Sequence, residues 1–372
     1  MTNSSDPQEK SSSNKSFEPD DQQPVRILGI ETSCDETAAA VIENGRVILS
    51  NQVASQADLH AQFGGVFPEV ASRQHILTIY PIIEQTLHGA HLTINELDAI
   101  AVTRGPGLPG SLAVGINTAK GLCLGSGLPL IGVNHLEAHI YSAWLDPDER
   151  EKINEPQFPL LALIVSGGHS ELVLMTGHLE YKRLGGTLDD AAGEAFDKVS
   201  RMLGLSYPGG PSIQAAAEDG NSLAFNFPRA WLEGTWNFSF SGLKTAVLRE
   251  VRRLETGGTP LPVPNLAASF QAAVVDVLVG KTLAAAKEFK AKEILIAGGV
   301  SANISLRNTF EERANIPLHI PPIDLCTDNA AMVACAGFFR YIIGQRDLLD
   351  IDVLPNWPIS ELRESTLNIN QH

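Results

Sequence analysis

Long apolar segments are missing from this 372-residue chain. No apolar run approaches the roughly 20 residues that cross a membrane, and the first 24 residues lack the apolar centre of a secretory signal. Those residues are polar and carry several acids, which argues against a transit peptide and predicts a disordered polar tail over residues 1–24. We therefore expect a cytoplasmic protein that does not bind membranes.

Cysteines and basic residues are also scarce. Cys34, Cys123, Cys326 and Cys335 form no C-x-x-C pair, so a disulfide scaffold and a cysteine-rich zinc site are disfavoured. Acids outnumber bases, and the net charge of −16 argues against non-specific binding of polyanions. A nucleic-acid substrate would require a local basic patch or a partner protein.

The common nucleotide-binding signatures are absent too. Residues 241–245 do not form a Walker A end, because Leu243 separates the glycine from the lysine. Residues 105–110 match G-x-G-x-x-G, but no acid between Asp98 and Glu137 is available to bind a ribose. The two prolines of this segment also lack N–H donors. We disfavour NAD binding and expect a rigid substrate-facing loop or a tight structural turn.

Two segments of the chain have the same pattern of strand, polar turn and strand. The four apolar runs cover residues 25–31, 38–42, 160–165 and 172–175. Their turns, residues 32–37 and 166–170, could each bind an anion through backbone N–H groups. The repeat indicates either two related lobes or two ordinary hairpins.

Helices and further strands alternate in the rest of the chain, which is the pattern of an α/β protein. Apolar spacing predicts a helix over residues 69–87, with Val70, Leu77, Tyr80, Ile83 and Leu87 on one face. The other predicted helices are 111–124, 135–145, 189–205, 243–254, 265–289, 302–314 and 329–343. The other predicted strands are 99–103, 129–133 and 293–297, and residues 257–264 are expected to form a loop. The charged segment 146–158 contains proline and is the expected boundary between lobes.

His135 and His139 lie four residues apart on a predicted helix, which puts both imidazoles on one face. The pair suits two ligands of one metal ion, or it is an ordinary pair of surface histidines. Asp328, before the last long helix, would complete the two-histidine, one-carboxylate set associated with Fe(II), or would serve as an N-cap. A zinc protease needs Glu directly after the first histidine, whereas Glu137 is one position further on.

Other polar and glycine-rich positions allow two interpretations each. Asp190, Glu194 and Asp197 share one face of a predicted helix, either as ribose acceptors or as a solvated acidic face. Gly209-Gly210 indicates close approach of the backbone or positive φ. The pair Gly298-Gly299 follows a strand and precedes a helix, as in a nucleotide cradle.

Seven segments, taken together and in order, resemble one family. They are IETSCDET (30–37), VSGGH (165–169), DDAAGEAFDK (189–198), YPGGP (207–211), FSFSGLKT (238–245), AGGVSAN (297–303) and CTDN (326–329). Over about residues 25–360 the chain resembles the TsaD family of bacterial tRNA N6-adenosine threonylcarbamoyltransferases.

The resemblance implies an α/β fold with two lobes and a cleft between them, like the actin, sugar-kinase and heat-shock-chaperone ATPases. Residues 25–150 and 151–328 would form the lobes, and residues 329–372 would pack back on the N-terminal lobe. The implied reaction moves a threonylcarbamoyl group from threonylcarbamoyl-AMP to N6 of the adenosine 3′ of the anticodon, in tRNAs reading codons that start with A. A non-catalytic nucleotide-binding scaffold is the alternative, and the position of Glu137 disfavours a metalloprotease.

The resemblance also implies roles for individual residues. His135, His139 and Asp328 would hold one Fe(II) per subunit, with zinc or magnesium as alternatives, and Asp35 would be catalytic. The substrate site would be lined by Ile164, Val165, Ser166, Gly167, Gly168, Asp197, Gly210 and Asn303. The implied partners are tRNA, a TsaB-like paralogue and a TsaE-like ATPase. Asn134 and Gln214 differ from some relatives, and a ribose contact at Gln214 is expected to be absent or altered.

Overall fold

The computed structural model describes residues 23–145 and 156–362. The predicted tail, except for its last two residues, and most of the predicted boundary segment lie outside this part of the chain. The expected limits of the two lobes stay predictions.

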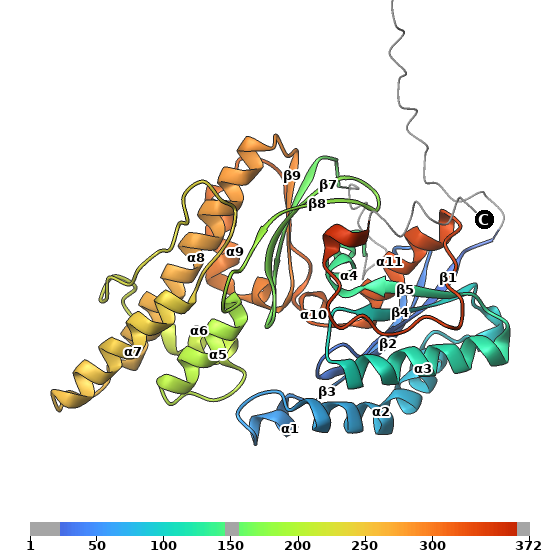
Figure 1. Cartoon of the computed structure of the whole chain (residues 1–372), viewed down its shortest axis with the longest axis horizontal. Helices are drawn as coiled ribbons and strands as arrows, with labels where there is room; N and C mark the ends of the chain where they lie inside the picture. The colour runs from blue at the N-terminus through green and yellow to red at the C-terminus, as the bar shows by residue number, and fades with distance from the viewer. Residues whose placement is uncertain (1–22, 146–155, 363–372) are drawn as a thin grey trace, which may run out of the picture.

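Two five-stranded sheets of identical topology form the centre of the molecule (Figure 1). The first contains β1 Arg26–Glu31, β2 Glu36–Glu43, β3 Val47–Ser55, β4 Ala99–Gly105 and β5 Leu130–Asn134, in the order β3-β2-β1-β4-β5. The second contains β6 Leu160–Val165, β7 Ser170–Gly177, β8 Glu180–Gly186, β9 Glu293–Ala297 and β10 Leu318–His319, in the order β10-β9-β6-β7-β8. In each sheet three strands form an antiparallel meander, and two more run parallel to the first. The predicted hairpins are confirmed, and the repeat extends to whole sheets.

Helices cover the outer face of each sheet (Figure 1). On the first sheet these are α2 Pro68–Gly89 and α3 Pro109–Ser126, with the short α1 Ala57–Ala61 beside them. The second sheet is accompanied by α5 Ala192–Met202, α6 Gly209–Ala217, α7 Ser241–Thr256, α8 Val263–Glu288 and α9 Ile304–Arg313. Most of the longer helices and strands match the predicted ones with ends shifted by a few residues. The elements α1, α6, β3, β8 and β10 were not predicted, and neither was the short α10 Ile323–Cys326. The helix α6 begins with Gly-Gly-Pro, which is typical of a turn.

Two helices lie between the sheets: α4 His135–Tyr141 and α11 Ala330–Ile342, with the short α10 Ile323–Cys326 nearby (Figure 1). One buried cluster joins side chains of both helices with side chains of both sheets, including Ile27, Ala162 and Met332. The helix that carries the two histidines is therefore held from both sides by a shared core.

The buried face of α2 differs from the predicted one. Leu77 and Tyr80 are 69% and 68% exposed, whereas His75, Ile79 and Thr86 are buried. Ile83 of the predicted face is buried as expected. The polar residues His75 and Thr86 share the buried face with apolar residues, and apolar periodicity does not detect them.

The helix α8 is long and apolar enough, by length and composition, to cross a membrane. However, 78% of its most apolar window is buried inside the molecule, where α8 packs against α6, α7 and α9. It is therefore a core helix beside the second sheet.

Candidate functional site

The start of α4 fixes the positions of the two histidines. The side chain of Asn134 caps this helix by accepting hydrogen bonds from the N–H groups of Leu136 and Glu137, and it donates one to the carbonyl of Trp357. His135 and His139 follow on one face and are only 5% and 0% exposed. A pair of surface histidines is thereby excluded.

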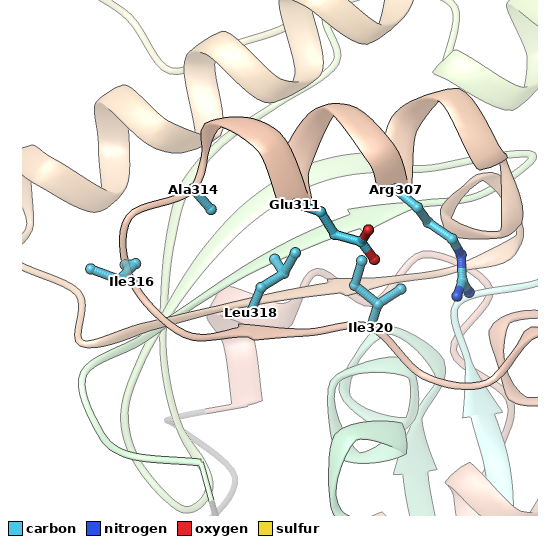
Figure 2. Close-up of a pocket in the computed structure, with 6 residues that line it drawn as sticks. All are labelled: Arg307, Glu311, Ala314, Ile316, Leu318 and Ile320. Carbon is cyan, nitrogen blue, oxygen red and sulfur yellow. The ribbon is translucent and has the colours of Figure 1, made fainter.

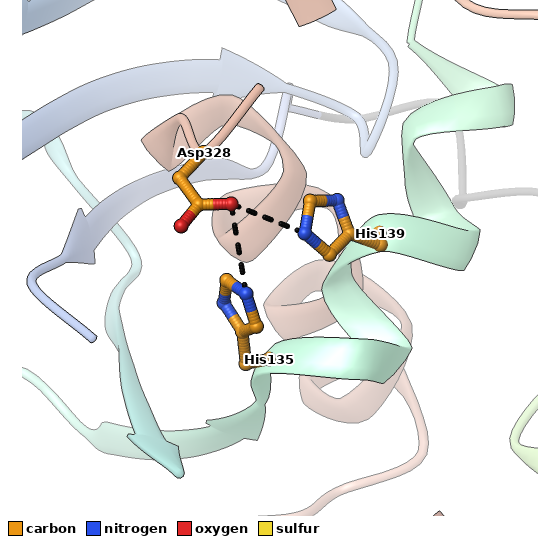
Figure 3. A group of neighbouring side chains, drawn as sticks. All are labelled: His135, His139 and Asp328. Atoms are coloured by element: carbon orange, nitrogen blue, oxygen red, sulfur yellow. Dashed lines mark ion pairs between the residues drawn. The ribbon is translucent and has the colours of Figure 1, made fainter. Parts of the chain in front are cut away.

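Asp328 comes from the segment between α10 and α11 and meets both histidines (Figure 3). It is not the N-cap, because the side chain of Asn329 caps α11 at the N–H of Met332. Its Oδ1 atom lies 3.6 Å from Nε2 of His135 and 3.2 Å from Nε2 of His139. One ligand atom from each residue falls within 4.8 Å of the others.

This geometry fits a bound metal ion. Ligand atoms that each lie about 2.1 Å from one ion are separated by about 3 to 3.5 Å, close to the observed separations. Nε2 of His139 is buried and has no hydrogen-bond partner among the described residues, although it faces Asp328. Two imidazole nitrogens and one carboxylate suit Fe(II) or zinc better than magnesium, which prefers oxygen ligands.

The electrostatics of the three residues favour a cation between them. Burial opposes ionisation of Asp328, but the charge of His135 and the contact with His139 outweigh burial and hold the pKa of Asp328 well below its usual range. Burial likewise opposes protonation of His135, but the charges of Asp328 and Glu31 raise its pKa to about 9. His169 has a pKa lowered to about 4 by burial and by the charges of His135 and His139. The centre is therefore within electrostatic range of the second hairpin turn.

Glu137, between the two histidines, has no catalytic position. It is fully buried, and it accepts hydrogen bonds from the hydroxyl of Tyr181 and from Nε of Arg340, each at 2.7 Å. This ion pair joins α4 to β8 and α11. A carboxylate so engaged cannot activate a water molecule, which agrees with the rejection of protease chemistry.

The turn between β1 and β2 carries Asp35, which is half-buried. The backbone of this turn is contacted by His75, whose Nε2 lies 3.0 Å from the carbonyl oxygen of Cys34. Nδ1 of His75 lies 2.8 Å from the hydroxyl of Thr37, and the N–H of Gln56 donates to the carbonyl of Asp35. No sequence pattern predicts a role for His75, because a polar residue on an apolar helix face gives no periodic signal.

The segment 105–110 supports the same turn from the other side. The N–H of Leu108 donates to the carbonyl of Ser33 at 2.8 Å, and a Cβ on Gly107 would lie 2.6 Å from that oxygen. The N–H of Gly107 donates to the carbonyl of Pro355. The segment is therefore a tight structural turn that packs on the first hairpin turn.

The turn between β6 and β7 is open by comparison. Gly167 and Gly168 are exposed, a Cβ on either would meet nothing within 4 Å, and their N–H groups have no partner among the described residues. Gly193 and Gly298 pack so closely on this turn that a Cβ on either would collide with the carbonyl of Ser166 or Val165. These glycines bring α5 and the strand end of β9 to the turn, while its amides stay available to an anion.

The other predicted substrate residues divide into two groups. Asp197 and Gly210 are half-buried, and Asp197 accepts a hydrogen bond from the N–H of Gly209. The side chains of Ile164 and Val165 are fully buried in the core, so only their backbone can reach a ligand. The side chain of Asn303 is 8% exposed and caps α9.

Asp190 and Gln214 have structural partners. Asp190 precedes α5 and forms ion pairs with Lys198 and Lys244, so it shares no helix face with Glu194 and Asp197. The predicted acidic helix face is wrong in this respect, because α5 starts later than expected. Oε1 of Gln214 accepts a hydrogen bond from the N–H of Ile304, which ties α6 to α9.

A cavity of about 420 Å³ lies at the edge of the second sheet, between α9 and β10 (Figure 2). Its lining consists of Arg307, Glu311, Ala314, Ile316, Leu318 and Ile320. None of these belongs to the two turns or to the histidine–aspartate cluster, so this cavity is separate from the candidate site.

Comparison with known proteins identifies the family of this chain. The model of the TsaD family, described as tRNA N6-adenosine threonylcarbamoyltransferase, matches residues 47–335. The chain belongs to the TsaD family. TsaD relatives that carry this same name include a protein from Dehalococcoides mccartyi, 56% identical over 331 residues, 89% of this chain and 98% of the relative. Another, from Bacillus subtilis, is 49% identical over 351 residues, 93% of this chain and 99% of the relative.

Solved structures support the fold predicted for a TsaD chain. HypF from T. kodakarensis has a TM-score of 0.56 at 15% identity, over 86% of this chain and 48% of HypF. Component A of the (R)-2-hydroxyglutaryl-CoA dehydratase of Acidaminococcus fermentans has a TM-score of 0.50 at 14% identity, over 86% of this chain and 99% of that one. At these identities the likeness concerns the fold alone. The predicted two-lobed α/β fold of the actin, sugar-kinase and heat-shock-chaperone ATPase type is confirmed.

Proposed function

We propose that this chain transfers the threonylcarbamoyl group from threonylcarbamoyl-AMP to N6 of the adenosine 3′ of the anticodon, in tRNAs reading codons that start with A. Membership of the TsaD family supports this activity. The observation that carries it is the cluster of His135, His139 and Asp328. His135 contacts the first hairpin turn, which bears Asp35, and the cluster acts electrostatically on His169 of the second, whose glycine amides have no partner among the described residues.

His135, His139 and Asp328 would hold one divalent ion per subunit, and Fe(II) suits this donor set. When bound, such an ion supplies positive charge that polarises a carbonyl oxygen or neutralises a phosphate. Zinc is the alternative with the same ligand preferences.

The reaction is an acyl transfer to an aromatic amine. The N6 lone pair forms a bond to the carbamoyl carbon, the bond from that carbon to the phosphate oxygen breaks, and AMP leaves with the electron pair. Amides of Gly167 and Gly168 would stabilise negative charge at the donor. The carboxylate of Asp35 would orient the amine and accept its proton.

Partners are part of this proposal, because a net charge of −16 repels tRNA. We propose that a TsaB-like paralogue and a TsaE-like ATPase assist this chain in the cytoplasm. The exposed apolar side chains Ile76, Leu77 and Tyr80 on α2 offer a surface for the paralogue. A groove of about 390 Å³ between α2 and α3 continues this surface.

The decisive experiment incubates the protein with partners from its own organism, threonylcarbamoyl-AMP and unmodified tRNA. Digestion of the tRNA followed by mass spectrometry should reveal threonylcarbamoyladenosine. Nucleotide binding without this product, with partners proven active on a related enzyme, would favour the non-catalytic scaffold. Near-normal turnover of Asp35→Ala would remove the proton-accepting role of Asp35.

A further inference from the structure

Glu31 is a fully buried carboxylate at the end of β1, next to the proposed metal centre. Its Oε1 accepts a hydrogen bond from the N–H of Ser33, and its Oε2 accepts one from the hydroxyl of Thr103 at 2.7 Å. Among the described residues no lysine or arginine pairs with it, and its one ionisable partner is His135. A buried carboxylate costs several kcal/mol without a compensating partner, so this contact requires an explanation.

The two ring nitrogens of His135 face different groups. Nδ1 lies 3.1 Å from Oε2 of Glu31, and Nε2 lies on the side of Asp328, 3.6 Å from its Oδ1. An imidazole that binds a metal ion through one nitrogen carries its single proton on the other, and a carboxylate can only accept a hydrogen bond. Glu31 therefore keeps the proton on Nδ1 and leaves the lone pair of Nε2 directed at the point shared with His139 and Asp328.

We propose that Glu31 is a positioning residue, which fixes the tautomer and ring orientation of His135 for metal binding. This inference rests on the proposed metal centre. Outer carboxylates commonly orient metal-binding histidines in this way. His139 has no such support, because its Nδ1 has no hydrogen-bond partner among the described residues.

Charge balance points in the same direction. A bound ion would use the lone pair of each imidazole and so leave both rings neutral. Glu31 and Asp328 would then give the buried centre two negative charges, which one divalent cation balances. Asp328 would supply its charge as a ligand, whereas Glu31 would act through His135. Removal of the charge of Glu31 should therefore weaken metal binding without removal of any ligand atom.

A competing candidate contacts the same nitrogen. The hydroxyl of Ser33 lies 3.2 Å from Nδ1 of His135. A hydroxyl can both donate and accept, so it does not select a tautomer. Ser33→Ala is therefore the matched control for Glu31→Gln, because it removes an uncharged contact to Nδ1, whereas Glu31→Gln removes the charge beside the same atom.

The test measures zinc affinity of the metal-free protein by competition with a chromophoric chelator. Glu31→Gln should weaken zinc binding about 10- to 100-fold, and Ser33→Ala should weaken it less than about 3-fold. The visible spectrum of the Co(II)-loaded protein should change in Glu31→Gln and stay unchanged in Ser33→Ala. Equal losses in both variants, or an unchanged affinity in Glu31→Gln, would overturn the inference.

A second variant protects the test against misfolding of Glu31→Gln. Thr103→Val removes the hydroxyl that holds Oε2 of Glu31 but keeps the charge, and it should weaken zinc binding on the order of 10-fold. Affinity equal to that of the unaltered protein would contradict the inference. If the unaltered protein binds no zinc, or if His135→Ala binds it equally well, the metal centre itself is wrong.

Discussion

The two hairpin turns occupy equivalent places in sheets of equal topology, yet they offer different chemistry. In the first, the hydroxyl of Thr32 donates to the carbonyl of Ser111, and His75 lies beside the carbonyl of Cys34. Its polar groups are largely engaged inside the protein. In the second, Gly167 and Gly168 expose amides without partners in the described part of the chain.

This difference shows that a repeated fold conserves geometry rather than chemistry. The first turn offers side chains, since Glu31 at its start contacts His135 of the proposed metal centre and Asp35 lies within the turn. The second offers backbone amides, since Gly167 and Gly168 are exposed and their N–H groups have no partner among the described residues. Four predictions test this division, from the largest expected effect to the smallest.

Removal of a proposed metal ligand should have the largest effect. His135→Ala and Asp328→Ala should each lower product formation on the order of 10³-fold or more, because the ion contributes several kcal/mol of charge stabilisation. Mass spectrometry of digested tRNA measures the product, and elemental analysis measures the metal. His88→Ala, at an exposed position at the end of α2, should change neither. Full activity of a metal-free variant would show that the reaction does not need the ion.

A side chain on the second turn should affect binding rather than folding. Gly167→Ala should lower kcat/KM by about 10²-fold, because one blocked amide donor costs that much in acyl transfer. The midpoint of denaturant unfolding should stay unchanged, since a Cβ there would meet nothing within 4 Å. Gly125→Ala, equally uncrowded but on α3, is the control that should keep full activity. If Gly167→Ala unfolded more easily but kept full activity, the second turn would serve folding rather than ligand binding.

A side chain near the first turn should affect folding instead. A Cβ on Gly115 would collide with the hydroxyl of Thr32, which anchors the turn to α3. Gly115→Ala should therefore lower the free energy of unfolding by about 1–3 kcal/mol. Urea denaturation measures this change, and an unchanged midpoint would show that the first turn is as loosely packed as the second.

The smallest expected effect is on amide hydrogen exchange, where each ligand should protect a different turn. Zinc should slow amide hydrogen exchange in residues 31–35 more than in residues 166–168, because it is bound through His135. A non-reactive analogue of threonylcarbamoyl-AMP should protect residues 166–168 more strongly. Equal protection of both turns by zinc alone would show that they respond as one unit.

Local sequence patterns predicted much of the fold. Strict alternation of apolar runs with polar turns identified both hairpins, and the spacing of His135 and His139 placed two imidazoles on one helix face. These inferences succeeded because the backbone period alone sets them. The prediction of the buried face of α2 was wrong in part, because His75 and Thr86 are buried and form hydrogen bonds that no hydrophobic pattern records.

The sequence by itself determined the α/β class, the repeated hairpins, the paired histidines and the resemblance to TsaD. Only the tertiary structure decided that Asp328 faces those histidines while Asn329 caps α11. It also decided that Glu137 pairs with Arg340 and that Glu31 lies beside Nδ1 of His135. Such contacts join residues distant in the chain, and their geometry arises only when both sheets pack around α4 and α11.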